Sequence, residues 1–334
     1  MRIDSSAPTR MDLAGGTYDI WPLYLFHPGA ITLNAALSLR AHCSLTPSPT
    51  GRIVMRSEDT GTVVEAAHWS ELSARSELRL VGGLLRHFEV PALEITTRSD
   101  SPVGAGIAGS SALNIAICGA LARWRGLDLD DETLLHIAMN VEAQAIDVPT
   151  GSQDYRPALY GGISAVELRV DGVRRVGLPV PPGELERRIV LAYTGASRNS
   201  GINNWEVFKQ HIDGNAAVYG HFARIRDAAV RMRAALESGD WPEVGRQIAA
   251  EWSERKLLAP GVTTPAIDAL MAGAAAAGAQ AAKVCGAGGG GCLFCFADPA
   301  DVPAVRTALE AGGARVLDYH VDTEGLRVSA SHAE

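Results

Sequence analysis

One stretch of the chain carries most of the information about its architecture: Pro102-Val103-Gly104-Ala105-Gly106-Ile107-Ala108-Gly109-Ser110-Ser111-Ala112. It follows a strand-like run at 93–97 and leads into an almost entirely apolar segment at 110–121. Such a segment, opened by residues that cap helices, is typical of a core helix. Glycines let a backbone approach an anion closely, and the N-terminus of the following helix adds a positive dipole. The stretch therefore predicts a phosphate-binding loop.

The loop belongs to neither of the two commonest nucleotide motifs. It has no Gly-Lys-Ser or Gly-Lys-Thr, and it has no acidic residue where the dinucleotide fingerprint requires one. A glycine-rich turn can also be purely structural. If the loop does bind a nucleotide, we expect the contacts to come from Pro102, Gly104, Ala105, Gly106, Ala108, Gly109, Ser110 and Ser111.

Length and composition place the chain among globular proteins. It has 334 residues, of which 47% are hydrophobic and 20% charged, with a mean hydropathy of +0.05. The length favours two domains. No apolar run approaches the length of a membrane span, and the N-terminus lacks the pattern of a signal peptide, so we expect a cytoplasmic protein.

Charge and cysteine content narrow the partners. The formal net charge of −8 argues against nucleic acid and anionic membranes, but a local field can still hold a phosphate. The five cysteines are an odd number in mostly apolar contexts, which favours a reducing compartment over disulfides. Cys292 and Cys295 form a C-x-x-C, yet their apolar neighbours indicate a buried strand rather than a metal or redox site.

The pattern of elements predicts an α+β protein with a break near 178–185, where prolines and a glycine cluster. We predict domains at 1–182 and 183–334. Strand-like runs occur at 30–37, 40–46, 52–56 and 93–97, and a second helix is expected at 130–144. The second half predicts helices at about 204–238, 241–258 and 265–277, strands at 281–286 and 292–297, and a final helix and strand within 303–321.

Two further glycine-rich segments flank the loop. The first is Ala7-Pro8-Thr9-Arg10-Met11-Asp12-Leu13-Ala14-Gly15-Gly16-Thr17-Tyr18-Asp19, and the second is Lys283-Val284-Cys285-Gly286-Ala287-Gly288-Gly289-Gly290-Gly291-Cys292. With these three motifs in this order, the chain resembles the GHMP kinases, a family that includes galactokinase, homoserine kinase and mevalonate kinase. The resemblance implies a two-domain fold, with an N-terminal domain like ribosomal protein S5 domain 2 and a ferredoxin-like C-terminal domain.

The first motif suggests which branch of the family is nearest. Galactokinase-like members have Glu-His in the turn where this chain has Gly16 and Thr17, so the turn resembles that of the heptose-phosphate kinases. The spacing of Asp19 from Arg10 also matches the family, which implies that Asp19 accepts sugar hydroxyls, together with Gly16 and Thr17. An ordinary turn aspartate is the alternative.

The catalytic residues are assigned by the same resemblance. Asp154, in Gly151-Ser152-Gln153-Asp154-Tyr155, matches the aspartate that accepts or orients the proton of the substrate hydroxyl. Phosphoryl transfer needs such a carboxylate and a cation that neutralises charge, a role that suits Arg10. Glu142 and Ser111 match the magnesium ligands of the family. Each carboxylate could instead be an ordinary turn or surface residue.

The remaining candidates lie in the second half. Gly288 and Gly289 belong to the loop that closes over phosphates and substrate in the family. Arg198, and Lys209 further on, follow a turn similar to that of the heptose kinases and could bind a distal substrate phosphate. A capped helix start with a solvated lysine explains the same residues equally well.

The resulting hypothesis is transfer of a phosphoryl group from ATP, with Mg²⁺, to a sugar or sugar-phosphate hydroxyl. A heptose 7-phosphate at its anomeric position is the first candidate, and a neutral hexose or heptose is the close alternative. A catalytically silent sugar- and nucleotide-binding regulator and a mevalonate-type kinase or decarboxylase stay open. A homodimer is possible, and the sequence names neither the sugar nor the pathway.

Overall fold

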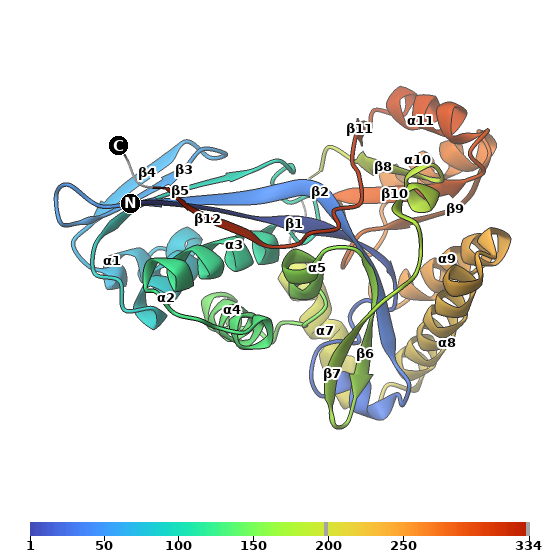
Figure 1. Ribbon diagram of the computed structural model, residues 1–334. Helices are drawn as coiled ribbons and strands as arrows, with labels where there is room; N and C mark the ends of the chain where they lie inside the picture. The colour runs from blue at the N-terminus through green and yellow to red at the C-terminus, as the bar shows by residue number, and fades with distance from the viewer. Residues whose placement is uncertain (197–199, 332–334) are drawn as a thin grey trace.

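Two β-sheets organise the molecule (Figure 1). The computed structural model describes residues 1–196 and 200–331. The first sheet has eight strands, with the order β12-β1-β2-β5-β3-β4, while β6 pairs with β2 and β7 with β6. Its strands are β1 (Arg2–Ala14), β2 (Ile31–Thr46), β3 (Ile53–Ser57), β4 (Thr62–Ala66), β5 (Leu93–Ser99), β6 (Ile163–Arg169), β7 (Gly172–Gly177) and β12 (Arg327–Ser331).

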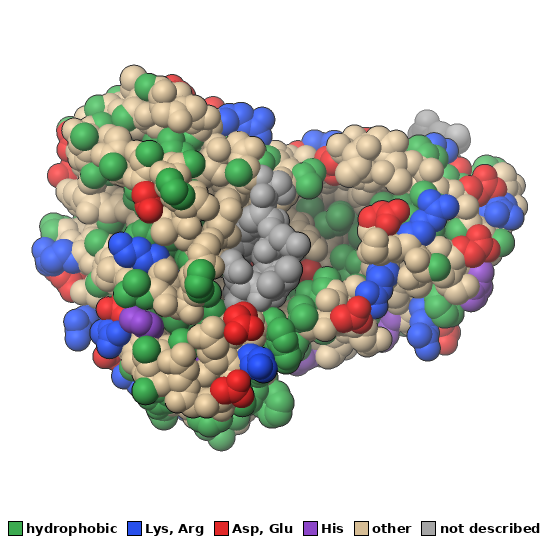
Figure 2. Space-filling view, turned by 180° about the vertical axis from the view of Figure 1, so that it is seen from behind, with side chains coloured by type: hydrophobic (Ala, Val, Ile, Leu, Met, Phe, Trp, Pro, Cys, Tyr) green, Lys and Arg blue, Asp and Glu red, His purple; other side chains and the backbone are tan. Residues whose placement is uncertain are grey.

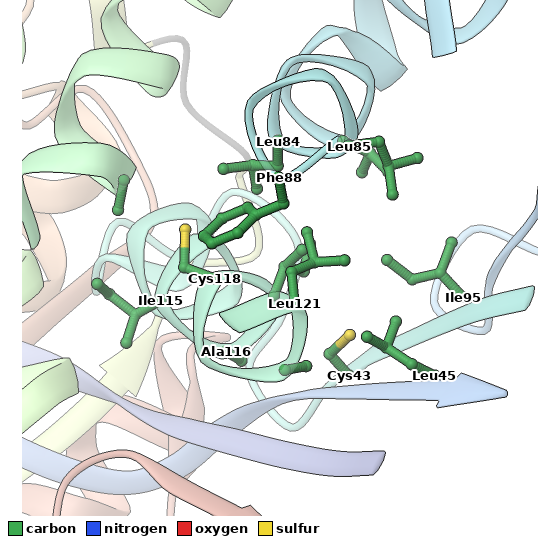
Figure 3. Close-up of a cluster of buried hydrophobic side chains, with 14 of the residues drawn as sticks. Cys43, Leu45, Leu84, Leu85, Phe88, Ile95, Ile115, Ala116, Cys118 and Leu121 are labelled. Atoms are coloured by element: carbon green, nitrogen blue, oxygen red, sulfur yellow. The ribbon is translucent and has the colours of Figure 1, made fainter. Parts of the chain in front are cut away.

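Helices cover one face of this sheet. They are α1 (Trp69–Ser73), α2 (Arg79–His87), α3 (Gly109–Trp124), α4 (Asp131–Ile146) and α5 (Tyr155–Tyr160), with short 3-10 turns η1 (Leu23–Phe26) and η2 (Ser76–Leu78). Figure 3 shows part of the core between them, where Phe88, which follows α2, and Leu121 of α3 face Leu45 and Ile95 from the sheet. The apolar residues that predicted a core helix at 110–121 are buried in this layer, which fixes the position of the loop before it.

The second sheet is antiparallel and has the order β11-β8-β10-β9. Its strands are β8 (Ile189–Tyr193), β9 (Ala279–Val284), β10 (Cys292–Ala297) and β11 (Arg315–Leu317). Numbered along the chain, this order is 4-1-3-2, the ferredoxin-like arrangement. The surrounding helices are α6 (Pro182–Glu186), α7 (Ser200–Ile212), α8 (Ala216–Ser238), α9 (Trp241–Arg255), α10 (Pro265–Ala276) and α11 (Val302–Ala311). The predicted α+β class is therefore confirmed.

Three local expectations need correction. The helix expected at 204–238 is two helices, because Gly214 takes a left-handed φ of 82° and Asn215 caps α8 through bonds from the Ala217 and Val218 amides. The strands expected at 30–37 and 40–46 form the single strand β2. The final strand β12 was not expected and pairs antiparallel with β1.

The chain therefore returns to the first sheet at its end. Leu326 donates its amide to the carbonyl of Leu159, at the end of α5, and β12 lies beside β1. The division at residue 182 stays a prediction, with the qualification that 327–331 pair with the first sheet. In the part of the chain that the structure describes, no helix is both long and apolar enough to cross a membrane.

Candidate active site

A polar cavity, partly open to solvent, forms where the end of β1, the start of α5 and the loop after β9 come together. Figure 2 shows that the face opposite to Figure 1 is hollowed between two lobes. The cavity draws on the first and third predicted motifs and on the segment around Asp154. It is lined by Arg10, Asp12, Thr17, Asp19, Ile20, Gly151, Gln153, Asp154, Arg255, Gly286 and Ala287.

Arg10 and Asp154, predicted as the catalytic pair, are in direct contact. Arg10 Nε donates to Asp154 Oδ1 at 2.8 Å, and Nη2 lies 2.7 Å from the same oxygen. Arg10 is 3% exposed, whereas the Asp154 side chain is 30% exposed. Burial opposes the charge of Arg10, but Asp154 and Asp12 raise the pKa of the guanidinium above its ordinary value. Both contacts use Oδ1, and none of the described residues bonds to Asp154 Oδ2, which leaves this oxygen for a ligand.

Asp19 lies beside this pair and is almost fully buried. The backbone amide of Gln153 donates to its Oδ2 at 2.8 Å, and Gly151 packs so closely that a Cβ there would collide with the carboxylate. Burial and the nearby charge of Asp154 raise the pKa of Asp19 to about 6. Its carboxylate, with one oxygen held by a backbone amide, has the chemistry to accept bonds from hydroxyl groups, the role that the resemblance implies.

The turn between Arg10 and Asp19 is strained. Thr17 has a φ of 77°, which is rare for a β-branched residue, and it is held there at the cavity wall. Gly16 cannot be larger, since a Cβ would collide with the Asp12 carboxylate. The structure places Thr17 in the cavity wall, whereas the Gly16 carbonyl accepts a bond from Arg255.

Four buried charges behind the turn were missed from the sequence. Arg255 Nε donates to Glu251 at 2.7 Å, and Lys283 Nζ lies 3.1 Å from the other oxygen of Glu251. Asp12 lies 3.6 Å from both cations. All four side chains are at most 2% exposed. Two carboxylates and two cations thus compensate one another, as buried charges must.

The predicted phosphate loop has the backbone that glycine favours. Gly104 and Gly106 have φ values of 70° and 72°, and Ala108 has a φ of 60° at the N-cap of α3. The loop also joins the other motifs. The Arg10 amide donates to the carbonyl of Ile107 at 2.9 Å, and the amide of Cys292 donates to that of Ala105 at 2.6 Å.

Glu142 and the serines at the start of α3 also meet. Ser110 Oγ donates to Glu142 Oε1 at 2.9 Å, and Ser111 Oγ lies 3.5 Å from Oε2. Tyr155 OH donates to Oε2 at 2.6 Å. Burial raises the pKa of Glu142, against the bonds from Tyr155, Ser110 and Asn114.

These oxygens are the ligand type that Mg²⁺ takes, and a cation would relieve the cost of burying Glu142 as an anion. Among the described residues there is no group of three or more His, Cys, Asp or Glu side chains that could hold a metal alone. A metal at Glu142 and Ser111 would therefore need further oxygens, which nucleotide phosphates supply.

The remaining predicted substrate residues are placed less directly. The amide of Gly289 donates to the carbonyl of Val262, and a Cβ at Gly288 would collide with that carbonyl. Of the third motif, Gly286 and Ala287 line the cavity, whereas Gly288 and Gly289 do not. Lys209 is 61% exposed and lies 3.8 Å from Asp213. Arg198 lies outside the described residues.

Comparison with known proteins identifies the family. The model of the GHMP kinase N-terminal domain matches residues 77–162, and that of the C-terminal domain matches 232–315, together just over half of the chain. The chain belongs to the GHMP kinase family. The predicted family is confirmed, and this GHMP kinase is an ATP-using phosphotransferase.

Its relatives include sugar kinases and mevalonate kinases. It is 28% identical to D-glycero-alpha-D-manno-heptose 7-phosphate kinase of Campylobacter jejuni, over 97% of this chain and 98% of that protein. It is 25% identical to mevalonate kinase of Thermococcus sibiricus, over 98% of each. A D-glycero-D-manno-heptose 1-phosphate kinase structure from Bacteroides thetaiotaomicron superposes with a TM-score of 0.79 at 26% identity, over 99% of this chain and 100% of that one.

Proposed function

We propose that this GHMP kinase phosphorylates a hydroxyl of a sugar phosphate, with a heptose 7-phosphate at its anomeric position as the first candidate. The carrying observation is the Arg10 and Asp154 pair beside Asp19 in one cavity. The heptose-phosphate kinases among the relatives support a sugar, and the glycine-rich turn at Gly16 supports the heptose branch. Mevalonate, the substrate named for other relatives, is the second candidate.

The geometry assigns distinct roles in phosphoryl transfer. Asp154 Oδ2 orients the acceptor hydroxyl and takes its proton as the hydroxyl oxygen bonds to the γ-phosphorus. The bond between that phosphorus and the bridging oxygen breaks, and the electron pair leaves with ADP. Arg10, fixed by Asp154 Oδ1 and the carbonyl of Gly106, lies where it can neutralise charge on the moving phosphoryl group.

The nucleotide phosphates bind the loop at 102–111 and the positive end of α3 in this proposal. Glu142 and Ser111 would hold Mg²⁺, which supplies charge neutralisation for the phosphates when bound. Hydrogen bonds from Ser110 and Tyr155 already hold the Glu142 carboxylate in position, so its position does not depend on bound Mg²⁺.

Sugar recognition falls to residues of the cavity wall beside Arg10 and Asp154. Asp19, held by the Gln153 amide, accepts substrate hydroxyls, and Thr17 adds a hydroxyl of its own. Gly288 and Gly289 would close over the ligand through backbone groups, and Arg198 would contact a distal phosphate. A cytoplasmic location and a homodimer stay predictions.

The test is ADP release from MgATP with a panel of heptose 7-phosphates, free heptoses, hexoses, uronic acids and mevalonate. We expect the highest kcat/KM with a heptose 7-phosphate, formed as the sugar 1,7-bisphosphate, which phosphorus NMR distinguishes from other products. Preference for mevalonate would overturn the sugar assignment. Tight nucleotide binding without turnover of any panel member would favour the silent-binder hypothesis.

A further inference from the structure

Arg255 is a buried arginine in the wall of the cavity, far in sequence from the predicted motifs. It is the last residue of α9, 2% exposed, and it lies between the turn at Gly16 and the charged pair of Glu251 and Lys283. Asp19 also acts on it: although burial opposes the charge, Glu251, Asp12 and Asp19 raise the pKa of Arg255 above its ordinary value. Arg255 therefore remains a cation, and it lies close to Asp19, the residue proposed to accept the sugar hydroxyls.

The guanidinium has one more N–H than the described residues use. Nε donates to Glu251, Nη2 donates to Glu251 and to the carbonyl of Gly16, and Nη1 donates to Thr17 Oγ1 at 3.4 Å. An arginine has five N–H groups, of which Nη1 carries two. The described residues take one of these two, so Nη1 has an N–H left for a ligand, and both Arg255 and its partner Thr17 line the cavity.

The charges around the cavity indicate what kind of group this N–H meets. Asp12 and Glu251 compensate Arg255 and Lys283, and Arg10 compensates Asp154. Of the three aspartates that line the cavity, Asp19 is the one for which the described residues supply no ion pair. An anionic substrate group beside Asp19 would be repelled, whereas a neutral hydroxyl can donate to Asp19 and a neighbouring hydroxyl can accept from Arg255.

We propose that Arg255 is a specificity-determining residue. Its Nη1 donates a hydrogen bond to one substrate hydroxyl, while the neighbouring substrate hydroxyl donates to Asp19, so that the cavity selects an uncharged diol. This inference rests on the proposed function. It places the neutral part of the substrate in the cavity and leaves any phosphate of the sugar outside it. The buried cluster of Asp12, Glu251 and Lys283 holds the guanidinium in that orientation.

The experiment compares Arg255→Lys with the wild type on the heptose 7-phosphate and its monodeoxy analogues. Lysine keeps the charge but loses the planar fork. We expect the KM for the sugar to rise about 10- to 100-fold, the effect of one hydrogen bond to a charged group, with the KM for ATP unchanged. For one monodeoxy analogue, the KM with the wild type should rise by a similar factor. The KM with Arg255→Lys should rise almost no further for this analogue, because the deoxygenation and the substitution remove the same hydrogen bond.

Arg188→Lys is the matched control. Arg188 is also nearly buried and paired with a glutamate, Glu184, but it does not line the cavity. An Arg255→Lys enzyme that folds, and whose sugar KM and analogue ranking equal those of this control, would show that Arg255 is structural. Equal losses with every analogue would lead to the same conclusion.

A wild-type measurement serves if Arg255→Lys does not fold. The contribution of the hydroxyl bound by Asp19 should fall below pH 6, whereas that of the hydroxyl bound by Arg255 should not, since arginine stays charged. If all hydroxyl contributions fall together with pH, the inference is wrong. Absence of both turnover and binding for every sugar with the wild-type protein overturns the proposed function, and this inference with it.

Discussion

Two carboxylates near the start of α5, Asp154 and Glu142, have partners of different kinds. Asp154 is paired with the guanidinium of Arg10 and is 30% exposed in the cavity. Glu142 is 7% exposed and receives bonds from two serine hydroxyls, an asparagine amide and the hydroxyl of Tyr155. Among the described residues, no cation forms an ion pair with Glu142. One carboxylate already has its counter-charge, and the other is arranged to receive one.

The start of α5 thus positions two carboxylates that are proposed to do different chemistry, one as a proton acceptor and one as a metal ligand. Asp154 and Tyr155 are neighbours in the chain, so the start of α5 fixes one carboxylate directly and orients the other through a hydroxyl. A carboxylate with a fixed cation stays available as a proton acceptor, whereas a buried one with only hydroxyl donors gains most from a bound metal. Each side can be perturbed alone.

The largest effect is expected at Asp154. Asp154→Asn removes the proton acceptor but keeps the shape of the side chain, so we expect kcat to fall by about 10²- to 10⁴-fold, as for loss of a general base. Nucleotide binding, followed by calorimetry, should be retained. Asp147→Asn is the control, since Asp147 is also paired with an arginine, Arg79, but is exposed outside the cavity. Retention of more than a tenth of kcat would refute the role of Asp154.

A smaller and different effect is expected at Glu142. Glu142→Gln should raise the Mg²⁺ concentration for half-maximal activity by about 10- to 100-fold, the range seen when the ligand environment of a metal is altered. It should not lower the melting temperature, because burial already disfavours the charged form. Glu167→Gln, which alters a glutamate paired with Arg233, is the matched control. An unchanged Mg²⁺ titration would place the metal elsewhere.

Asp19 sharpens the comparison through pH. With a pKa of about 6, it gains a proton below that pH and can no longer accept both sugar hydroxyls. We expect kcat/KM for the sugar to fall up to about tenfold per pH unit below 6, and this acid limb should disappear in Asp19→Asn. The sign for stability is opposite. The folded protein holds a proton that the unfolded chain has lost, so Asp19 makes the fold less stable as pH rises from about 4 to 6.

Glycines and apolar runs made much of the fold predictable. The strand at 93–97, the loop and the core helix of α3 were found because backbone freedom and burial leave strong patterns. The final strand β12 was missed because it has only five residues, all of them exposed, and its alternation of polar and apolar residues rests on Val328 and Ala330 alone. Its pairing with β1 depends on backbone hydrogen bonds, and those are independent of residue type.

The site residues that could be predicted are the charged residues that lie in or next to glycine-rich motifs. The structure places Arg10, Asp19 and Asp154 together, although their roles stay proposals. Asp12 and Lys283 gave a signal, since each has apolar neighbours on both sides in its strand, where an unpaired charge would be costly. Glu251 and Arg255 gave none, because an i, i+4 pair on a helix is usually a surface pair in sequence. Only the packing of α9 shows that this one is buried.

The smallest effect is expected where the two carboxylate sites meet. Tyr155→Phe removes the 2.6 Å hydrogen bond to Glu142 but keeps the buried ring. Glu142 retains the bonds from Ser110 and Asn114, so we expect a few-fold rise in the Mg²⁺ requirement and a loss of about 1 kcal/mol in the free energy of unfolding. Tyr160→Phe is the control, because Tyr160 donates to another glutamate, Glu132, at 3.0 Å. If the two variants give the same Mg²⁺ titration, α5 does not couple Asp154 to the Glu142 site, and the two carboxylates act independently.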